Sequence, residues 1–111
     1  MSRDALGDLE HLVLLAVLRL GDRAYGVPIL EEIAARTGRT PSRPAVYVAL
    51  RRLESRRLLT SQLGEPSAMR GGRAKRFFTV TPVGLRQLRE SRTAFLSMWA
   101  NVAHRLKRRP S

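Results

Sequence analysis

Apolar residues follow a helical period in several segments of the chain, and glycine, proline and short polar stretches separate these segments. Residues 9–20 are apolar on nearly every side of a helix, which indicates burial on two faces. Residues 26–36 carry a single apolar stripe, with Pro28 suited to a first helical turn and Gly38 to a left-handed end. The first helix therefore needs a second surface besides its own domain.

A third helix is predicted to begin after Ser42, whose hydroxyl suits an N-cap. Val46, Leu50 and Leu53 recur at i, i+4 and i+7 and predict a stripe that faces the core. The basic residues of this segment fall mostly off that stripe; they are Arg51, Arg52, Arg56 and Arg57.

Two strands are expected next, over residues 58–63 and 76–81. The stretch between them, residues 64–74, is rich in glycine and predicts a hairpin loop. Phe77 and Phe78 point to opposite faces of the second strand, so one is expected to fill the core and the other to pack on the final helix.

A final helix is predicted from Pro82 to about Leu106. Its apolar residues are spaced by 3, 7, 4, 3 and 4 positions, as in a heptad seam with Arg92 at one polar position. This seam predicts a dimer interface; the alternative is an amphipathic helix that folds back on its own domain. The seam residues are Leu85, Leu88, Phe95, Trp99, Val102 and Leu106.

The order of elements predicts an α+β fold that is mostly α. Three helices and a two-stranded wing form a winged helix-turn-helix, and a C-terminal helix follows it. We expect residues 1–81 to form the DNA-binding domain and residues 82–111 to form a dimerisation helix with a basic tail.

The formal net charge of the chain is +12, from 21 Lys and Arg against 9 Asp and Glu, and 19 of the 21 cations are arginine. Such an excess favours a polyanionic partner, most often nucleic acid; the alternative is a basic surface that only aids solubility. There is no cysteine, which excludes disulfides and thiolate metal sites. We expect no metal, no cofactor and a cytoplasmic location, since the longest apolar run, residues 12–18, is too short to span a bilayer.

Several short motifs follow one another in a definite order and spacing along residues 9–90. They are Tyr25-Gly26, then Ser42, Val46-Tyr47, Leu50 and Leu53-Glu54, then Leu58-Leu59, and finally Gly71-Gly72-Arg73, Arg76 to Thr81, and Gly84. In this order and spacing they resemble the PadR family of bacterial transcriptional regulators. The resemblance implies a winged-helix fold, a homodimer formed through the C-terminal helix, and repression of a neighbouring gene. With one helix after the wing, the chain resembles the short-tailed branch. It departs from the family at Pro44, where glycine is frequent, and at Val48, where proline or arginine is common.

The third helix is expected to enter the major groove of DNA with its first turn nearest the bases, and the wing to approach the minor groove. The predicted DNA contacts are Ser42, Arg43, Ala45, Tyr47, Arg51 and Arg52 on the helix, and Arg70, Arg73 and Lys75 in the wing. The resemblance gives Tyr47 a contact with the DNA backbone. Alternatives are a capping role alone for Ser42, simple packing for Tyr47, and an ion pair with Glu65 for Arg73. A two-fold dimer would bind a pseudo-palindrome.

Trp99 and Phe95 lie together on the predicted seam, where some short-tailed relatives admit flat aromatic effectors; the alternative is plain interface packing. An enzyme is not expected, because His11 and His104 are far apart in sequence and fit structural or surface roles. The main rival to a specific regulator is a basic protein that coats nucleic acid without sequence choice. A second rival is a peripheral membrane binder that uses the basic tail and Trp99.

Overall fold

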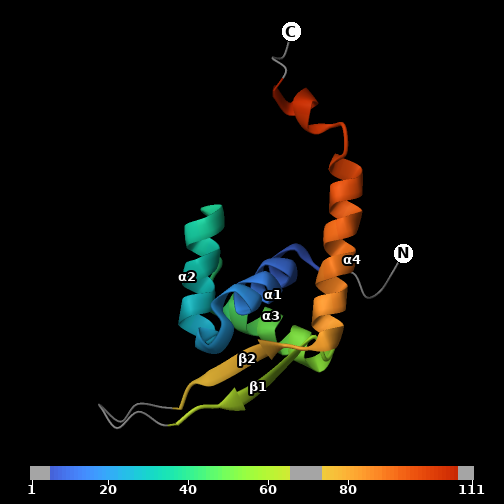
Figure 1. Ribbon diagram of the computed structural model, residues 1–111. Coiled ribbons are helices and arrows are strands. Elements are labelled where there is room, and N and C mark those ends of the chain that lie inside the picture. The colour runs from blue at the N-terminus through green and yellow to red at the C-terminus, as the bar shows by residue number, and fades with distance from the viewer. Residues whose placement is uncertain (1–5, 66–73, 108–111) are drawn as a thin grey trace.

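Three helices form the body of the protein in the computed structural model, which describes residues 6–65 and 74–107. The helices are α1 (Asp8–Leu20), α2 (Gly26–Thr37) and α3 (Arg43–Ser55), with the 3-10 helix η1 (Gly21–Arg23) after α1. Strands β1 (Leu59–Leu63) and β2 (Arg76–Val80), helix α4 (Pro82–Trp99) and the 3-10 helix η2 (Ala103–Lys107) follow. The order of elements is as predicted, and α4 runs past α1 and away from the body (Figure 1).

The core lies where α1 and α3 meet the sheet. The predicted stripe of α3 is buried, with Val46, Leu50 and Leu53 each at most 1% exposed. Leu14 of α1 and Leu59 of β1 are equally enclosed. Burial of aliphatic side chains of this size contributes roughly 1.5–3 kcal/mol each, so this stripe fixes how α3 is rotated about its axis.

Helix α1 is buried on one side only. Val13 and Val17 lie in the core, whereas Leu15 and Leu18 are exposed. The sequence predicted burial on both sides, and within the protomer only one of these sides is covered.

The two strands pair antiparallel, with Leu59 opposite Val80 and Leu63 opposite Arg76. The prediction that one of the two neighbouring phenylalanines fills the core is confirmed by Phe78, which is buried. The prediction for Phe77 is wrong: its ring meets the edge of Tyr25 at the start of α2, with 5.3 Å between centroids, instead of packing on α4. The odd and even residues of β2 face opposite sides, and the start of α2 lies on the side of Phe77.

The final helix is shorter than predicted, because it ends at Trp99 and not near Leu106. Ala100 is extended, with ψ of 128°, and Asn101 adopts a left-handed conformation with φ of 61°. Asparagine tolerates that conformation better than most residues and commonly ends helices. Because the helix ends here, Val102 and Leu106 do not continue the helical seam. The heptad spacing of the sequence did not reveal this break.

The start of α4 is fixed to the connection between α3 and β1. The Thr81 hydroxyl accepts a hydrogen bond from the Gly84 N–H at 2.9 Å and donates one to the Arg57 carbonyl at 2.7 Å. Leu88, one turn further, is only 7% exposed and belongs to the core. The first part of α4 thus packs on its own domain, which was the alternative to the seam.

Gly84 provides a test of this attachment. A Cβ at this position would collide with the Leu58 carbonyl oxygen and lie 2.9 Å from Cγ1 of Val80. We therefore expect Gly84→Ala to lower the free energy of unfolding by about 1–3 kcal/mol, measured by denaturant titration. Thr93→Ala, at an exposed position of the same helix, is the control and should leave stability unchanged or slightly raised. Equal stability of the two variants would contradict the tight approach.

Candidate nucleic-acid interface

The side of α3 that faces solvent is set by its buried stripe. Ser42 caps the helix, since its Oγ accepts a hydrogen bond from the Ala45 N–H at 3.2 Å. This confirms the predicted N-cap. Opposite the core, the exposed side chains of the helix are Arg43, Pro44, Tyr47, Val48, Arg51, Arg52 and Ser55.

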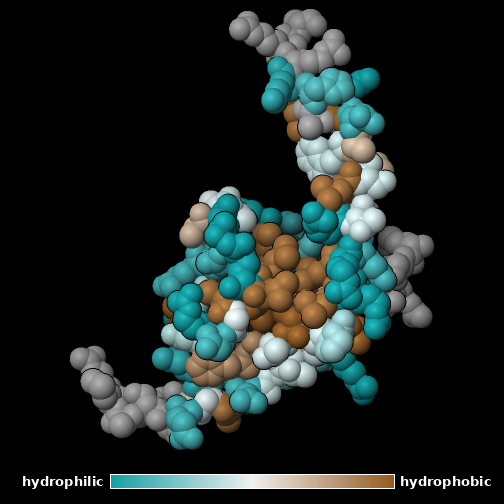
Figure 2. All heavy atoms as spheres, in the orientation of Figure 1, coloured by the Kyte–Doolittle hydropathy of each residue, from teal (hydrophilic) through white to brown (hydrophobic). Residues whose placement is uncertain are grey.

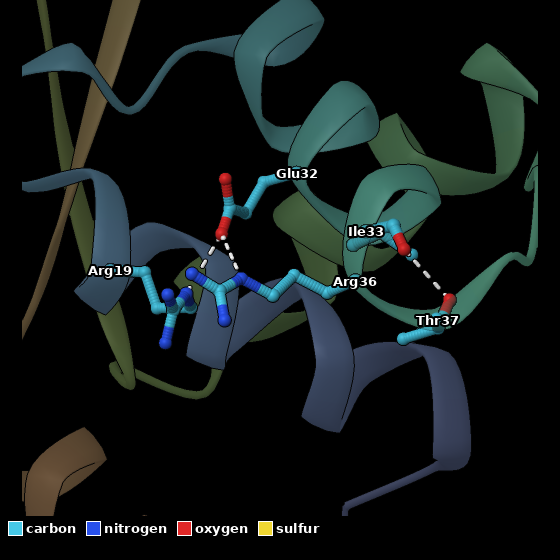
Figure 3. Close-up of polar contacts among 5 residues, drawn as sticks. All are labelled: Arg19, Glu32, Ile33, Arg36 and Thr37. Carbon is cyan, nitrogen blue, oxygen red and sulfur yellow. Dashed lines mark hydrogen bonds and ion pairs between the residues drawn. The ribbon is translucent and has the colours of Figure 1, made fainter.

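Elsewhere on the body, acidic side chains form ion pairs with four arginines of the described residues. Glu32 Oε2 accepts hydrogen bonds from Arg19 Nε at 2.8 Å and Arg36 Nε at 3.1 Å (Figure 3). The hydrogen bond from Arg19 is the main cause that lowers the pKa of the Glu32 carboxyl. Desolvation opposes it, and the hydrogen bond from Arg36 and the charges of both arginines lower the pKa further. Two further pairs join Arg39 to Asp8 at 2.7 Å and Arg56 to Glu10 at 3.7 Å.

The arginines on the outer side of α3 are different. Within residues 6–65 and 74–107, Arg43, Arg51 and Arg52 take part in none of the ion pairs. The acids therefore offset cations on α1, α2 and the end of α3, and leave those of the exposed side uncompensated. A guanidinium without a carboxylate partner is available to phosphate or guanine.

A groove of about 590 Å³ separates α3 from the wing and the start of α2. Its lining includes Tyr25, Gly26, Tyr47, Arg51, Lys75 and Arg76. Three of the predicted contacts thus meet at one groove: Tyr47 and Arg51 from α3, and Lys75 from the residue before β2.

Tyr47 lies directly over the first residue of α2. A Cβ on Gly26 would collide with the Tyr47 hydroxyl oxygen and lie 2.8 Å from Cζ. Only glycine leaves room for the ring there, even though the side chain is 45% exposed. The hydroxyl is thereby held at the N-terminal end of α2, where the helix dipole favours an anion.

Tyr25 connects the wing to the helices. Its ring contacts Phe77 at the edge, and Lys75 Nζ lies 4.8 Å above its centroid. Next to it, the Phe78 N–H donates a hydrogen bond to the Ala24 carbonyl at 2.8 Å. These contacts fix the base of β2, including Lys75, relative to α2.

The other predicted contacts that the structure describes do not line this groove. Ala45 and Arg52 line a separate hollow beside the start of α1, on the other flank of α3. Arg43 is exposed at the first residue of the helix. Arg70 and Arg73 lie outside the described residues.

Glu54 and Arg76 were not identified from the sequence as members of this groove. Arg76 donates from Nη1 to Ser61 Oγ at 3.0 Å, and Ser61 donates to Glu54 Oε2 at 2.6 Å. This chain joins β2, β1 and α3 through polar side chains. In the sequence, Glu54 and Arg76 belong to the motifs that carry the family resemblance. Those motifs do not reveal that the two side chains share a groove.

The comparisons with known proteins agree with this architecture. The model of the transcriptional regulator PadR-like family matches residues 14–90. The chain belongs to this family. Its members are transcriptional regulators and not enzymes. A search of curated proteins gave no match.

Solved structures of two PadR-family regulators and of one further DNA-binding protein share the fold. A regulator from Clostridium difficile superposes with a TM-score of 0.76 at 20% identity, over 90% of this chain and 99% of that one. One from Eggerthella lenta has a TM-score of 0.67 at 28% identity, over 88% and 83%. BpsR from Bordetella bronchiseptica, whose DNA binding is regulated by 6-hydroxynicotinic acid, has a TM-score of 0.64 at 22% identity, over 96% and 76%.

The PadR-family chain has a second surface, a groove of about 700 Å³ between α1 and α4. Figure 2 shows apolar atoms gathered over α1 between α2 and α4. The lining is mainly apolar and includes Leu15, Leu18, Leu85, Phe95, Leu96 and Trp99. Of the predicted seam, Leu85, Leu88, Phe95 and Trp99 line this groove, and Leu88 is also buried in the core.

His11 lies within this second groove. Its ring stacks on Phe95 with 5.9 Å between centroids, and Nδ1 lies 3.5 Å from Ser91 Oγ. Partial burial lowers the pKa of His11, and the charge of Asp8 opposes the shift. These contacts give His11 a packing role between α1 and α4.

None of the helices in the described ranges has the length and apolar character that crossing a bilayer requires.

The overlap between Tyr47 and α2 gives a test of the first groove. We expect Gly26→Ala to displace the Tyr47 ring toward solvent and to weaken DNA binding about 3- to 10-fold, as loss of one positioned contact does. The free energy of unfolding should change by less than about 1 kcal/mol, because the ring is half-exposed and can move.

A double-variant cycle with Tyr47→Ala supplies the control. If Gly26 acts through Tyr47, the double variant binds DNA no more weakly than Tyr47→Ala alone. Additive losses would show that Gly26 affects binding by another route.

Proposed function

We propose that this protein binds duplex DNA sequence-specifically as a homodimer and represses transcription. The observation that carries the proposal is that two cations in none of the ion pairs among the described residues, Arg51 and Lys75, line one groove together with Tyr47. Together with the chain's net charge of +12, these cations favour a polyanionic partner in the groove that α3 and the base of β2 line.

In this proposal α3 enters the major groove by its N-terminal half. Arg51 reaches toward the bases or the adjoining phosphates from the wing side of the helix, and Arg52 does so from the other flank. Tyr47, held over Gly26, contacts a phosphate at the positive end of α2. The wing, with Lys75 at its base and Arg70 and Arg73 beyond, follows the adjacent minor groove.

The homodimer rests on the apolar groove between α1 and α4. Contiguous apolar surface of this kind marks a protein interface when it is exposed. Leu18 and Phe95 are exposed in the protomer, and the later half of α4 projects beyond the body (Figure 1). An isologous pair, with α4 of each copy against the groove of the other, would cover both surfaces at once.

A two-fold dimer would present its two α3 helices to successive major grooves, about 34 Å apart, on a pseudo-palindromic operator. Occupation of a promoter by such a dimer would block transcription, which is why we infer repression. The site of action would be the cytoplasm, where bacterial DNA lies.

An aromatic effector stays a prediction of the sequence. Trp99 and Phe95 line the groove between α1 and α4, so a flat aromatic compound there would act at the dimer interface. BpsR, whose DNA binding responds to 6-hydroxynicotinic acid, shares the fold.

Selection of bound fragments from randomised duplex DNA tests the proposal. A specific dimer should enrich one pseudo-palindromic motif and bind it at least about 1,000-fold more tightly than bulk DNA. The log of its binding constant should fall by about 0.9 per phosphate neutralised as log salt rises. Enrichment of no motif would support the rival, a protein that coats nucleic acid without sequence choice.

On the selected operator, Arg51→Gln should cost about 1–3 kcal/mol of binding free energy, measured by fluorescence anisotropy. Arg36→Gln is the matched control, because Arg36 lies on α2 and is paired with Glu32. That variant should change affinity by less than about twofold. Equal losses in both variants would mean that only the total charge matters.

Leu18→Glu tests the dimer. Leu18 is 48% exposed in the protomer, so the fold should accept glutamate there, but a second copy could not bury the charge. We expect sedimentation to show a monomer where the native chain is a dimer, with operator affinity reduced at least about tenfold.

Val83→Glu is the matched control for this variant. Val83 lies in the first turn of α4 and is 44% exposed, but it is outside the groove between α1 and α4. It should remain dimeric. A native chain that sediments as a monomer, or a dimeric Leu18→Glu variant, would contradict this arrangement.

A further inference from the structure

The outward side of α3 is apolar where a recognition helix comes nearest to the bases. Pro44 and Val48 are exposed there, and Ala45 is half-buried beside them. With Gly7 and Leu9 at the start of α1, these three residues line a hollow of about 460 Å³. We define Pro44, Ala45 and Val48 as the apolar strip of α3.

Near the strip, α3 offers few polar side chains that could form hydrogen bonds with the edges of DNA bases. The Ser42 hydroxyl caps the helix through Ala45, and the Ser55 hydroxyl donates to the Arg52 carbonyl at 3.0 Å. Residues 43–55 include no Asn or Gln, the side chains that pair with adenine edges. Hydrogen-bond readout from α3 is therefore left to the arginines at the margins of the strip.

The exposure of Val48 has no evident benefit for folding. The buried stripe of α3 is complete without Val48, which is 39% exposed. Valine also has a lower helix propensity than alanine or arginine, so this choice slightly weakens the helix. DNA that presents an apolar group in its major groove would account for an exposed valine at this position.

In the major groove, the apolar group that a base pair offers is the C5-methyl of thymine. We propose that Val48 and Ala45 contact thymine methyl groups in each half of the operator. The strip thereby selects A·T pairs, with arginine-read pairs beside them. This inference rests on the proposed function, because it places α3 in the major groove.

The same contact disfavours cytosine. Cytosine presents its N4 amino group near the position of the thymine methyl and its neighbouring oxygen. Against Val48 that amino group would lose water without gaining an acceptor, at a cost in free energy. The strip is thus a specificity-determining element through both attraction and exclusion.

Deoxyuridine provides the experiment, because it differs from thymidine only by the methyl group. In the selected operator, each thymidine of one half-site is replaced singly by deoxyuridine, and the dissociation constant is measured by anisotropy. We expect binding to weaken about 3- to 5-fold at one or two neighbouring positions, as loss of a buried methyl predicts, and to be unchanged elsewhere.

Val48→Ala then assigns the contact. This variant should bind the thymidine and deoxyuridine operators nearly equally at the position that Val48 contacts, while a position that Ala45 contacts keeps its sensitivity. Alanine at an exposed helical site preserves the fold. Val83→Ala is the matched control, since Val83 has similar exposure on α4 and should keep the sensitivity.

The outcomes separate this inference from the proposed function. A selected operator that the native chain binds equally well with every deoxyuridine overturns the methyl contact and leaves the regulator proposal intact. Sensitivity that is unchanged at every position in Val48→Ala overturns the assignment to Val48. Failure to enrich any operator removes the proposed function, and the inference with it.

Discussion

The burial of one side of α3 governs what the other side can do. Val46, Leu50 and Leu53 fill the core against α1 and β1, and this fixes the rotation of the helix. Turning the helix would expose these side chains and bury arginine, at a cost of several kcal/mol for each unpaired charge. The cations and the apolar strip of α3 are outside because hydrophobic burial leaves them no other place.

The distribution of acids sharpens this arrangement. Glu32 binds both Arg19 and Arg36, and these pairs lie on α1 and α2, away from the groove that Tyr47 and Arg51 line. Since exposed ion pairs stabilise a fold only slightly, their larger effect here is on the electrostatic field. Of the unpaired cations among the described residues, Arg51 and Lys75 line the groove beside the wing, whereas Arg86, Arg89 and Arg92 lie on α4.

Helix α4 serves two surfaces in succession. Its start is fastened through Thr81 and buries Leu88 in the protomer, while Phe95 and Trp99 lie in the open groove beside α1. Because the first half of α4 is packed on the body, the later half has a fixed direction. The proposed symmetric dimer requires such a fixed direction. The DNA-binding body and the proposed interface are therefore mechanically linked, and His11 packs at their junction against Phe95.

The sequence by itself determined the elements and their inner faces. The spacing of Val46, Leu50 and Leu53 and the cap at Ser42 were enough to define α3, because helical periodicity and capping involve residues close together in the chain. The ordered motifs were also enough for the family. The same local patterns could not distinguish Leu88, which faces its own core, from Phe95, which does not.

Only the tertiary structure decided those questions, because they depend on residues distant in sequence. It brought Lys75 and Phe77 of the wing against Tyr25, and it placed Arg51 and Arg52 on opposite flanks of α3. It also ended α4 at Trp99, where the left-handed Asn101 interrupts a heptad pattern that the sequence alone continues. Periodicity specifies which side of a helix is apolar, whereas packing between elements specifies what that side meets.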